Sequence, residues 1–188
     1  LPEPPARTHH FLDVGADASY EPDLIEGGYG IQCYEEGLYG SFSTSFLKDL
    51  MSHCPVGKRS RSGSSRQLIS YLEQWTVLRL LQVYGDRLRG STVHLSEDNQ
   101  GVYYWLHQLN GCGNSASAGM MKTIVMLCYL YDIKLAPEWR CSRLNVIPDV
   151  LSGILNGGRK GCSTAGKDGD KKSIAREMLT MWSASRNG

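Results

Sequence analysis

Four carboxylates in this chain could together hold divalent cations. Asp17 ends a β-favouring run, Asp98 follows another, and Asp149 falls in the first turn of an expected helix. Glu73 is unusual because apolar residues surround it at helical spacing, and an unpaired buried charge is very costly. Carboxylates that converge repel one another unless cations hold them. A set of oxygen ligands without Cys or His favours Mg²⁺ or Mn²⁺ over zinc, and a pair of such ions suits phosphodiester cleavage.

Each of these carboxylates also has a simpler explanation. Helical periodicity alone favours a place for Glu73 at the edge of the apolar stripe, where it would reach solvent. Asp17 could be a turn residue, and Asp149 could stabilise the positive end of a helix. The sequence pattern alone leaves both readings open.

The elements that must position these residues alternate between strands and helices. A first strand is expected to end near Ala16 and Asp17, and a hairpin of two more strands should follow at about 28–34 and 38–44. A long helix carries Glu73, and Ser64 has the capping-box spacing that would start it. The later elements are expected as a strand at 91–96, a helix from Val102 to Leu109 ended by Gly111, a helix at 118–131, a strand at 133–139 and a helix at 145–155. This order predicts an α/β domain with a mixed sheet.

The composition fits one domain of ordinary size. The chain has 188 residues, 41% of them hydrophobic and 21% charged, which is enough for a core. The net charge of +1 excludes a general attraction to nucleic acid, so any such site must come from local clusters. The six cysteines lack zinc-site spacing and are typical of reduced thiols. Because no apolar run reaches the length of a bilayer span or a signal peptide, we expect an intracellular protein, in cytoplasm or nucleus, and no membrane partner.

Four stretches resemble the motifs of ribonuclease H domains of retroelement reverse transcriptases, most closely those of DIRS-type elements. The matching stretches are ADAS at 16–19, ISYLEQWTVLRLLQVYGDRLRG at 69–90, VHLSEDNQGVYYWL at 93–106 and NVIPDVLSG at 145–153. The resemblance implies a ribonuclease H-like mixed five-stranded sheet, three antiparallel strands and then β-α-β, flanked by helices. The domain would occupy residues 11–156, between a linker at 1–10 and a Gly/Lys-rich linker with a short helix at 157–188.

The resemblance also implies an activity and a set of ligands. The family cleaves the RNA strand of RNA–DNA hybrids, and Asp17, Glu73, Asp98 and Asp149 match its metal-binding carboxylates. The cofactor would be two Mg²⁺ ions, with Mn²⁺ as a substitute. The partners would be the hybrid and a reverse transcriptase domain of the same polyprotein. Glu97 should point away from the site, because neighbours on an extended strand alternate.

Candidate contacts to nucleic acid come from the motifs and from basic residues. Ser19 and Asn99 belong to the matched motifs. The basic residues are Lys58, Arg59, Arg61 and Arg66 in a stretch at 57–66 that reads as a loop, and Arg140 and Arg143 before the last aspartate. Cations facing phosphates supply most of the affinity for nucleic acid. The alternative is that these basic residues are only solvated surface.

The chain departs from the family pattern near its last motif. Pro148 stands where the family has a small residue, Gly153 stands where it has Arg, and no His lies between Trp139 and Asp149. These departures motivate an alternative function, a catalytically weak or inactive ribonuclease H-like module that binds hybrid or spaces domains in a polyprotein. A DNA-cutting relative of the transposase or integrase type is less favoured, because the Glu73 helix lies between the first two aspartates.

Overall fold

The structure is a computed structural model that describes residues 8–21, 23–53, 61–110, 115–141 and 144–153. These residues form five strands and five helices. In chain order they are β1 (Thr8–Glu21), β2 (Glu26–Cys33), β3 (Glu36–Ser41), α1 (Thr44–His53), α2 (Arg61–Tyr84), β4 (Ser91–Glu97), α3 (Gln100–Gln108), α4 (Ser115–Leu130), β5 (Lys134–Trp139) and α5 (Val146–Gly153).

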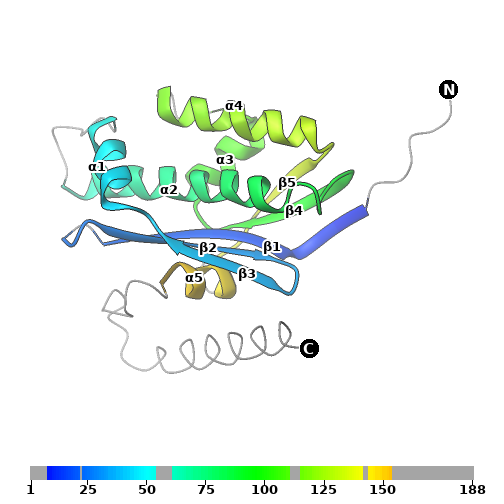
Figure 1. The fold of residues 1–188 in the computed structure, drawn as a ribbon, viewed down its shortest axis with the longest axis horizontal. Helices are drawn as coiled ribbons and strands as arrows, with labels where there is room; N and C mark the ends of the chain where they lie inside the picture. The colour runs from blue at the N-terminus through cyan, green and yellow to red at the C-terminus, as the bar shows by residue number, and fades with distance from the viewer. Residues whose placement is uncertain (1–7, 22, 54–60, 111–114, 142–143, 154–188) are drawn as a thin grey trace.

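The strands form one mixed sheet in the order β3-β2-β1-β4-β5. β2 is antiparallel to both β1 and β3, whereas β4 runs parallel to β1 and β5. The parallel pair β1–β4 needs a crossover, which α2 supplies, because parallel strands cannot be joined by a tight turn. α1 to α4 lie on one side of the sheet and α5 on the other (Figure 1). The predicted fold class, a mixed five-stranded sheet with three antiparallel strands and flanking helices, is therefore confirmed.

The core lies between the sheet and α2. Val14 and Ala16 of β1 and Leu95 of β4 are fully buried in one hydrophobic cluster with Val77 and Leu81 of α2. These side chains recur at alternate positions on the strands and at helical spacing on α2, as amphipathic elements require. The rigid packing of α2 on β1 and β4 sets the position of Glu73, which the same helix carries.

Glycines on β2 let α5 approach the other face of the sheet. A Cβ atom at Gly28 would lie 2.3 Å from the Ser152 carbonyl oxygen, and one at Gly30 would lie 2.3 Å from the Pro148 carbonyl oxygen. Both distances are far below a van der Waals contact, so only glycine fits under this helix. The direct contact of α5 with the β2 backbone brings Asp149 close to β1.

The sequence analysis missed α1. We expected the third strand to reach about residue 44 and the long helix to be the next helix, but β3 ends at Ser41 and α1 begins at Thr44. The Ser43 hydroxyl accepts a hydrogen bond from the Phe46 N–H at 3.2 Å, which is a helix N-cap. Leu47 and Leu50 of α1 are buried, so a short amphipathic helix follows directly on a β-rich run.

Other element ends also differ from the prediction. α2 begins at Arg61, so Ser64 lies inside the helix and does not cap it. α3 ends at Gln108 with Leu109 as its C-cap, whose backbone is left-handed with φ 52°, and Gly111 lies outside the described residues. β1 begins at Thr8, within the stretch read as a linker, whereas residues 157–188 lie outside the described part. Among the helices described, none combines the length and apolar character that a bilayer span needs.

Candidate metal centre

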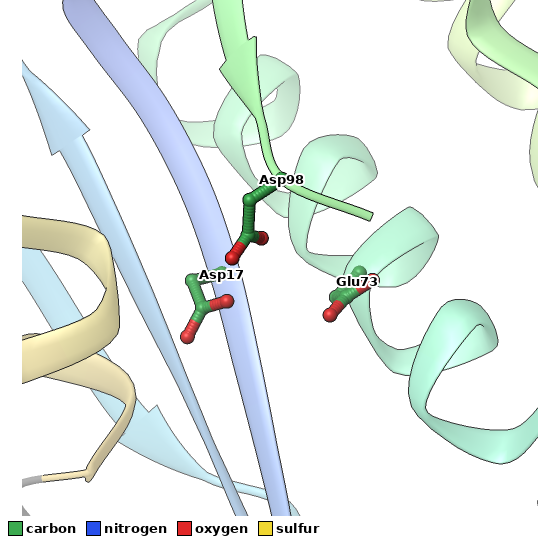
Figure 2. Close-up of side chains that lie close together, drawn as sticks. All are labelled: Asp17, Glu73 and Asp98. Atoms are coloured by element: carbon green, nitrogen blue, oxygen red, sulfur yellow. The ribbon is translucent and has the colours of Figure 1, made fainter. Parts of the chain in front are cut away.

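Three carboxylates from three elements meet at one end of the sheet. Asp17 lies on β1, Glu73 on α2, and Asp98 in the loop that follows β4. Each offers an oxygen atom, and these three atoms all lie within 4.8 Å of one another. Figure 2 shows the side chains pointing toward a shared space from the strand, the helix and the loop.

The end of the β1–β4 pairing creates this space. The last paired residues of the two strands are Gly15 and Ser96, so Asp17 has no partner on β4 beside it. β4 ends at Glu97, and the chain then turns into α3. Asp98 therefore lies where the two strands separate, and α2 places Glu73 over the same point.

Glu73 is buried with an unsatisfied oxygen. The residue is 6% exposed, and its Oε2 atom has no hydrogen-bond partner. Burial raises the pKa of Glu73 well above its ordinary value, the charges of Glu97 and Asp17 raise it further, and the Asn99 side chain lowers it by a hydrogen bond. The explanation from periodicity alone, that Glu73 reaches solvent at the edge of its stripe, is therefore wrong.

Asp17 is also held in an environment that disfavours its charge. It is 7% exposed, and burial is the main cause that raises its pKa to about 8. The charges of Asp98 and Asp149 act in the same direction, while a hydrogen bond from Ser152 lowers the pKa. A divalent cation would offset both the burial and the repulsion.

The helix α5 reaches Asp17 through Ser152. The Ser152 hydroxyl donates to Asp17 Oδ2 at 2.5 Å, and the Ser152 carbonyl oxygen accepts from the Ser19 hydroxyl at 2.6 Å. Asp149 lies one turn earlier on α5 and is half-buried; its charge reaches Asp17, but it is not in the group of three. Ser152 is a site residue that the sequence analysis did not single out, although it lies in the NVIPDVLSG stretch.

Asn99 joins the loop after β4 to two helices. Its Oδ1 accepts from the N–H groups of Gly101 and Val102 at 2.9 and 3.3 Å, which caps α3. Its Nδ2 donates to the Ser70 hydroxyl at 2.9 Å, and the same amide lowers the pKa of Glu73. Both ends of the Asn99 side chain thus have protein partners, which favours a structural role over the predicted contact to nucleic acid.

Glu97 is buried beside the three carboxylates. It is 0% exposed, its Oε1 accepts from the Asn99 N–H at 3.1 Å, and its charge raises the pKa of Glu73. Glu97 is nevertheless not one of the carboxylates that meet within 4.8 Å, so Asp98 rather than Glu97 joins that group, as expected.

The fold of this chain is similar to that of a solved structure. The crystal structure of RNase H1 from the halophilic archaeon Halobacterium salinarum NRC-1 superposes with a TM-score of 0.52, over 80% of this chain and 98% of that one. The fold is ribonuclease H-like. The sequence identity is only 12%, so the similarity extends to the fold alone. No protein-family model and no curated protein matches the chain.

The residues at this end of the ribonuclease H-like sheet suit a hard divalent cation. Asp17, Glu73 and Asp98 offer only carboxylate oxygens, which Mg²⁺ and Mn²⁺ prefer. The unpartnered Glu73 Oε2 is a buried atom whose burial is costly without a cation or a proton beside it. The donor set and the orphaned oxygen therefore fit a metal centre.

Of the predicted basic contacts, the structure describes Arg140 next to the end of β4. Arg140 directly follows β5, and its N–H donates to the Glu97 carbonyl oxygen at 2.8 Å. Arg61 and Arg66 lie in the first turns of α2 rather than in a loop, and nothing is described of their side chains. Lys58, Arg59 and Arg143 lie outside the described residues.

The aromatic residues of α3 divide between the core and the surface. Trp105 packs against Tyr71 of α2, with ring centroids 6.1 Å apart, so it contributes to the core. Tyr104 is 57% exposed and lies edge-on to Tyr103. Tyr104 is therefore the member of this aromatic run that could stack on a base.

Proposed function

We propose that this ribonuclease H-like domain is an endoribonuclease that cleaves the RNA strand of RNA–DNA hybrids in a reaction that depends on two divalent cations. The observation that carries the proposal is the convergence of Asp17, Glu73 and Asp98 within 4.8 Å, one of them with a buried unpartnered oxygen. The four motifs in family order support the same activity. The two observations are separate, because each motif is a short stretch of sequence, whereas the three carboxylates meet only in the folded chain.

Asp17, Glu73, Asp98 and Asp149 would hold the ions. When bound, Mg²⁺ or Mn²⁺ activates water and stabilises the leaving oxygen of the phosphodiester. The protein residues around the centre orient the ligands. Ser152 holds the Asp17 carboxylate by a hydrogen bond, and α5 keeps Asp149 near it. Because these groups belong to packed strands and helices, little reorganisation is needed during the reaction.

The hybrid would lie across the end of the sheet that carries the carboxylates. Arg140, whose backbone N–H donates to the Glu97 carbonyl oxygen at the end of β4, would contact a phosphate there. Tyr104 is exposed and could stack on a base. Recognition would rely on the shape of the groove and on 2′-hydroxyls rather than on base sequence.

We also infer a setting for this activity. The motifs at 16–19, 69–90, 93–106 and 145–153 resemble those of retroelements. The domain would therefore act beside a reverse transcriptase domain of the same polyprotein, inside the cell. Co-purification of the two domains from a tagged element tests this setting separately from cleavage.

A cleavage assay with several substrates tests the activity. The protein is incubated with an end-labelled RNA–DNA hybrid, duplex DNA or single-stranded RNA, in Mg²⁺ or in EDTA. We expect cleavage of the RNA in the hybrid alone, in Mg²⁺ alone, and its loss in Asp98→Asn. Asp86→Asn is the matched control, because Asp86 is an exposed partner of Arg89. Activity that persists in EDTA or in Asp98→Asn would contradict the proposal.

A second candidate function is hybrid binding without cleavage. Its support is the loop before Asp149, which has no His, and the presence of Pro148 beside that aspartate. Hybrid binding with no turnover and no bound cation would favour this function. A variant of this protein whose cleavage products differ from those of the wild type would exclude this function, because it would show that the domain itself cleaves the hybrid.

A further inference from the structure

A pair of buried polar side chains joins α2 to α4. Gln74 follows Glu73 on α2, Ser117 lies in the first turn of α4, and both Gln74 and Ser117 are 0% exposed. The Gln74 Nε2 donates to the Ser117 carbonyl oxygen at 3.2 Å, and the Ser117 hydroxyl donates to Gln74 Oε1 at 2.8 Å. Each residue therefore donates to the other and accepts from it, and both ends of the amide have a partner.

This pair contributes more to the geometry of the two helices than to their stability. An amide and a hydroxyl lose their hydration when they are buried, and their mutual hydrogen bonds do little more than offset that loss. Hydrogen bonds are directional, however, whereas hydrophobic packing is not. The pair therefore fixes how α2 is rotated about its axis, and how far it is displaced along that axis, relative to α4.

Glu73 is the residue of α2 for which that placement matters most. Its carboxylate meets those of Asp17 and Asp98, which come from other elements. The distances in a metal centre tolerate a change of only about 0.2 Å. A rotation of α2 by about 20° would move its Cα atoms by about 0.8 Å, because these atoms lie about 2.3 Å from the helix axis. A small rotation is therefore enough to withdraw the Glu73 carboxylate from the group.

Polar contacts on both sides of Glu73 hold this part of α2. The Ser70 hydroxyl, three residues earlier, accepts from Asn99 Nδ2 at 2.9 Å and so ties α2 to the loop after β4. Gln74, one residue later, ties α2 to α4 through Ser117. α4 is itself anchored, since its inward face is part of the hydrophobic core. Loss of the Gln74 pair would remove the polar contact on the α4 side.

We propose that Gln74 is a positioning residue for the cation centre, and that its two hydrogen bonds with Ser117 set the rotation of α2 and thereby the place of the Glu73 carboxylate. This inference rests on the proposed function, because it concerns a ligand of the same centre. Gln74 is fully buried, so it cannot contact the hybrid. Its loss should therefore change the cation affinity and kcat and leave the KM for the hybrid as it is.

Titration of Gln74→Leu with Mn²⁺, followed by electron paramagnetic resonance of the free ion, tests this role without any substrate. Leucine fills much of the same space but can form neither hydrogen bond. We expect the Kd for Mn²⁺ to rise roughly 10-fold, as when a residue that orients a metal ligand is lost. In the hybrid cleavage assay at saturating Mg²⁺, kcat should fall about 10- to 100-fold, while the KM for the hybrid stays within about twofold of the wild type.

Thr76→Val is the matched control. Thr76 is another polar residue of α2 that is 0% exposed, but its hydroxyl donates at 2.8 Å to the Leu72 carbonyl oxygen of the same helix. The variant thus removes a buried hydrogen bond of α2 without changing its contact with α4, and we expect wild-type Kd and kcat. An equal rise in Kd in the two variants would overturn the inference. A Gln74→Leu protein that is less stable in urea but keeps the wild-type Kd and kcat would also overturn it, because the pair would then only hold the helices together.

A second variant covers the case that Gln74→Leu does not fold, as judged by circular dichroism. Ser117→Ala removes the hydroxyl and leaves the hydrogen bond from Gln74 to the carbonyl oxygen. We expect a smaller rise in the Kd for Mn²⁺, and a wild-type Kd would overturn the inference. A wild type that binds no Mn²⁺ contradicts both proposals. A wild type that binds Mn²⁺ and cleaves hybrid, with a Gln74→Leu variant that does both equally well, contradicts this inference alone.

Discussion

The Ser152 hydroxyl donates a hydrogen bond of 2.5 Å to Asp17 Oδ2 and so joins α5 to β1. The same residue accepts from the Ser19 hydroxyl through its carbonyl oxygen, which gives the contact two points of attachment. One carboxylate of the candidate centre is therefore oriented by a helix that comes at the other end of the chain. The geometry of the candidate centre therefore depends on the position of α5 against the sheet.

Replacing Ser152 with Ala should weaken both the fold and the centre. The variant loses a hydrogen bond to a carboxyl group, which costs about 1–3 kcal/mol of unfolding free energy. We expect a lower urea midpoint and weaker Mn²⁺ binding, because Asp17 is no longer oriented. Ser41→Ala, at an exposed position of β3, is the control. Equal midpoints and equal Mn²⁺ affinities in the two variants would show that the contact does not matter.

Replacing Gly30 with Ala should displace α5. The new Cβ would meet the Pro148 carbonyl oxygen at 2.3 Å and Leu151 Cβ at 2.6 Å, and neither of these atoms is the flexible end of a side chain. We expect a loss of about 1–3 kcal/mol of unfolding free energy, typical of overpacking, and a loss of hybrid cleavage. The measurements are a urea titration and the cleavage assay.

Gly119→Ala provides the matched control for that variant. Gly119 lies in α4, and a Cβ there would have nothing within 4 Å. Because Ala is a better helix former than Gly, this variant should gain up to about 1 kcal/mol. A Gly30→Ala protein that is as stable and as active as Gly119→Ala would contradict the close contact of α5 with Gly30.

Two substitutions of Asn99 separate its capping role from its role beside Glu73. Asn99→Ala removes the cap of α3, which should cost about 1 kcal/mol. Asn99→Asp keeps the acceptor for the Gly101 and Val102 N–H groups but loses the donor to Ser70 and adds a charge near Glu73. We expect Asn99→Asp in EDTA to be less stable at pH 8 than at pH 5, relative to wild type.

Thermal unfolding at several pH values provides that comparison. If Asn99 instead contacts only nucleic acid, both variants would keep wild-type stability at every pH and lose affinity for the hybrid. Such a result would restore the prediction made from the motif and would contradict the structural role.

The metal-free protein should lose stability as the pH rises. Burial raises the pKa of Asp17 from its ordinary value of 3.8 to about 8, so between these values the folded protein holds one proton more than the unfolded chain. The free energy of unfolding then falls with pH, by about 1.4 kcal/mol per unit for one such group, until the pH passes the folded pKa. Glu73 and Glu97 act in the same direction.

Urea titrations in EDTA between pH 5 and pH 8 measure this slope. Asp17→Asn should flatten it, because the residue that changes its protonation is gone. Mg²⁺ should stabilise the wild type more at pH 8 than at pH 5, since the cation competes with the bound protons. A free energy of unfolding that rises with pH in EDTA would contradict the claim that burial raises the pKa values of these carboxylates in the metal-free protein.

Much of the fold followed from local patterns. The order of the strands and the long helices and the places of Asp98 after β4 and Asp149 in the first turn of α5 could be read from periodicity and from short motifs, whereas β1 continues past Asp17, its expected end, to Glu21. The helix α1 was missed because its N-cap, Ser43, follows directly on a β-favouring run. Local sequence cannot show that a strand gives way to a helix so abruptly.

The candidate site depended more on tertiary contacts. Helical periodicity cannot distinguish an edge residue from a buried one, so it favoured solvent exposure for Glu73, which is in fact 6% exposed. Ser152 has its partner, Asp17, 135 positions away, and nothing in the local sequence indicates that contact. Alternation along β4 correctly separated Asp98, which joins the group of three, from Glu97, which does not.

The most direct test of the account is anomalous diffraction from crystals of this domain soaked in Mn²⁺. The account predicts a Mn²⁺ ion in direct contact with carboxylate oxygens of Asp17, Glu73 and Asp98. Crystals in which these three side chains converge as described but bind no Mn²⁺, even at millimolar concentration, would contradict it.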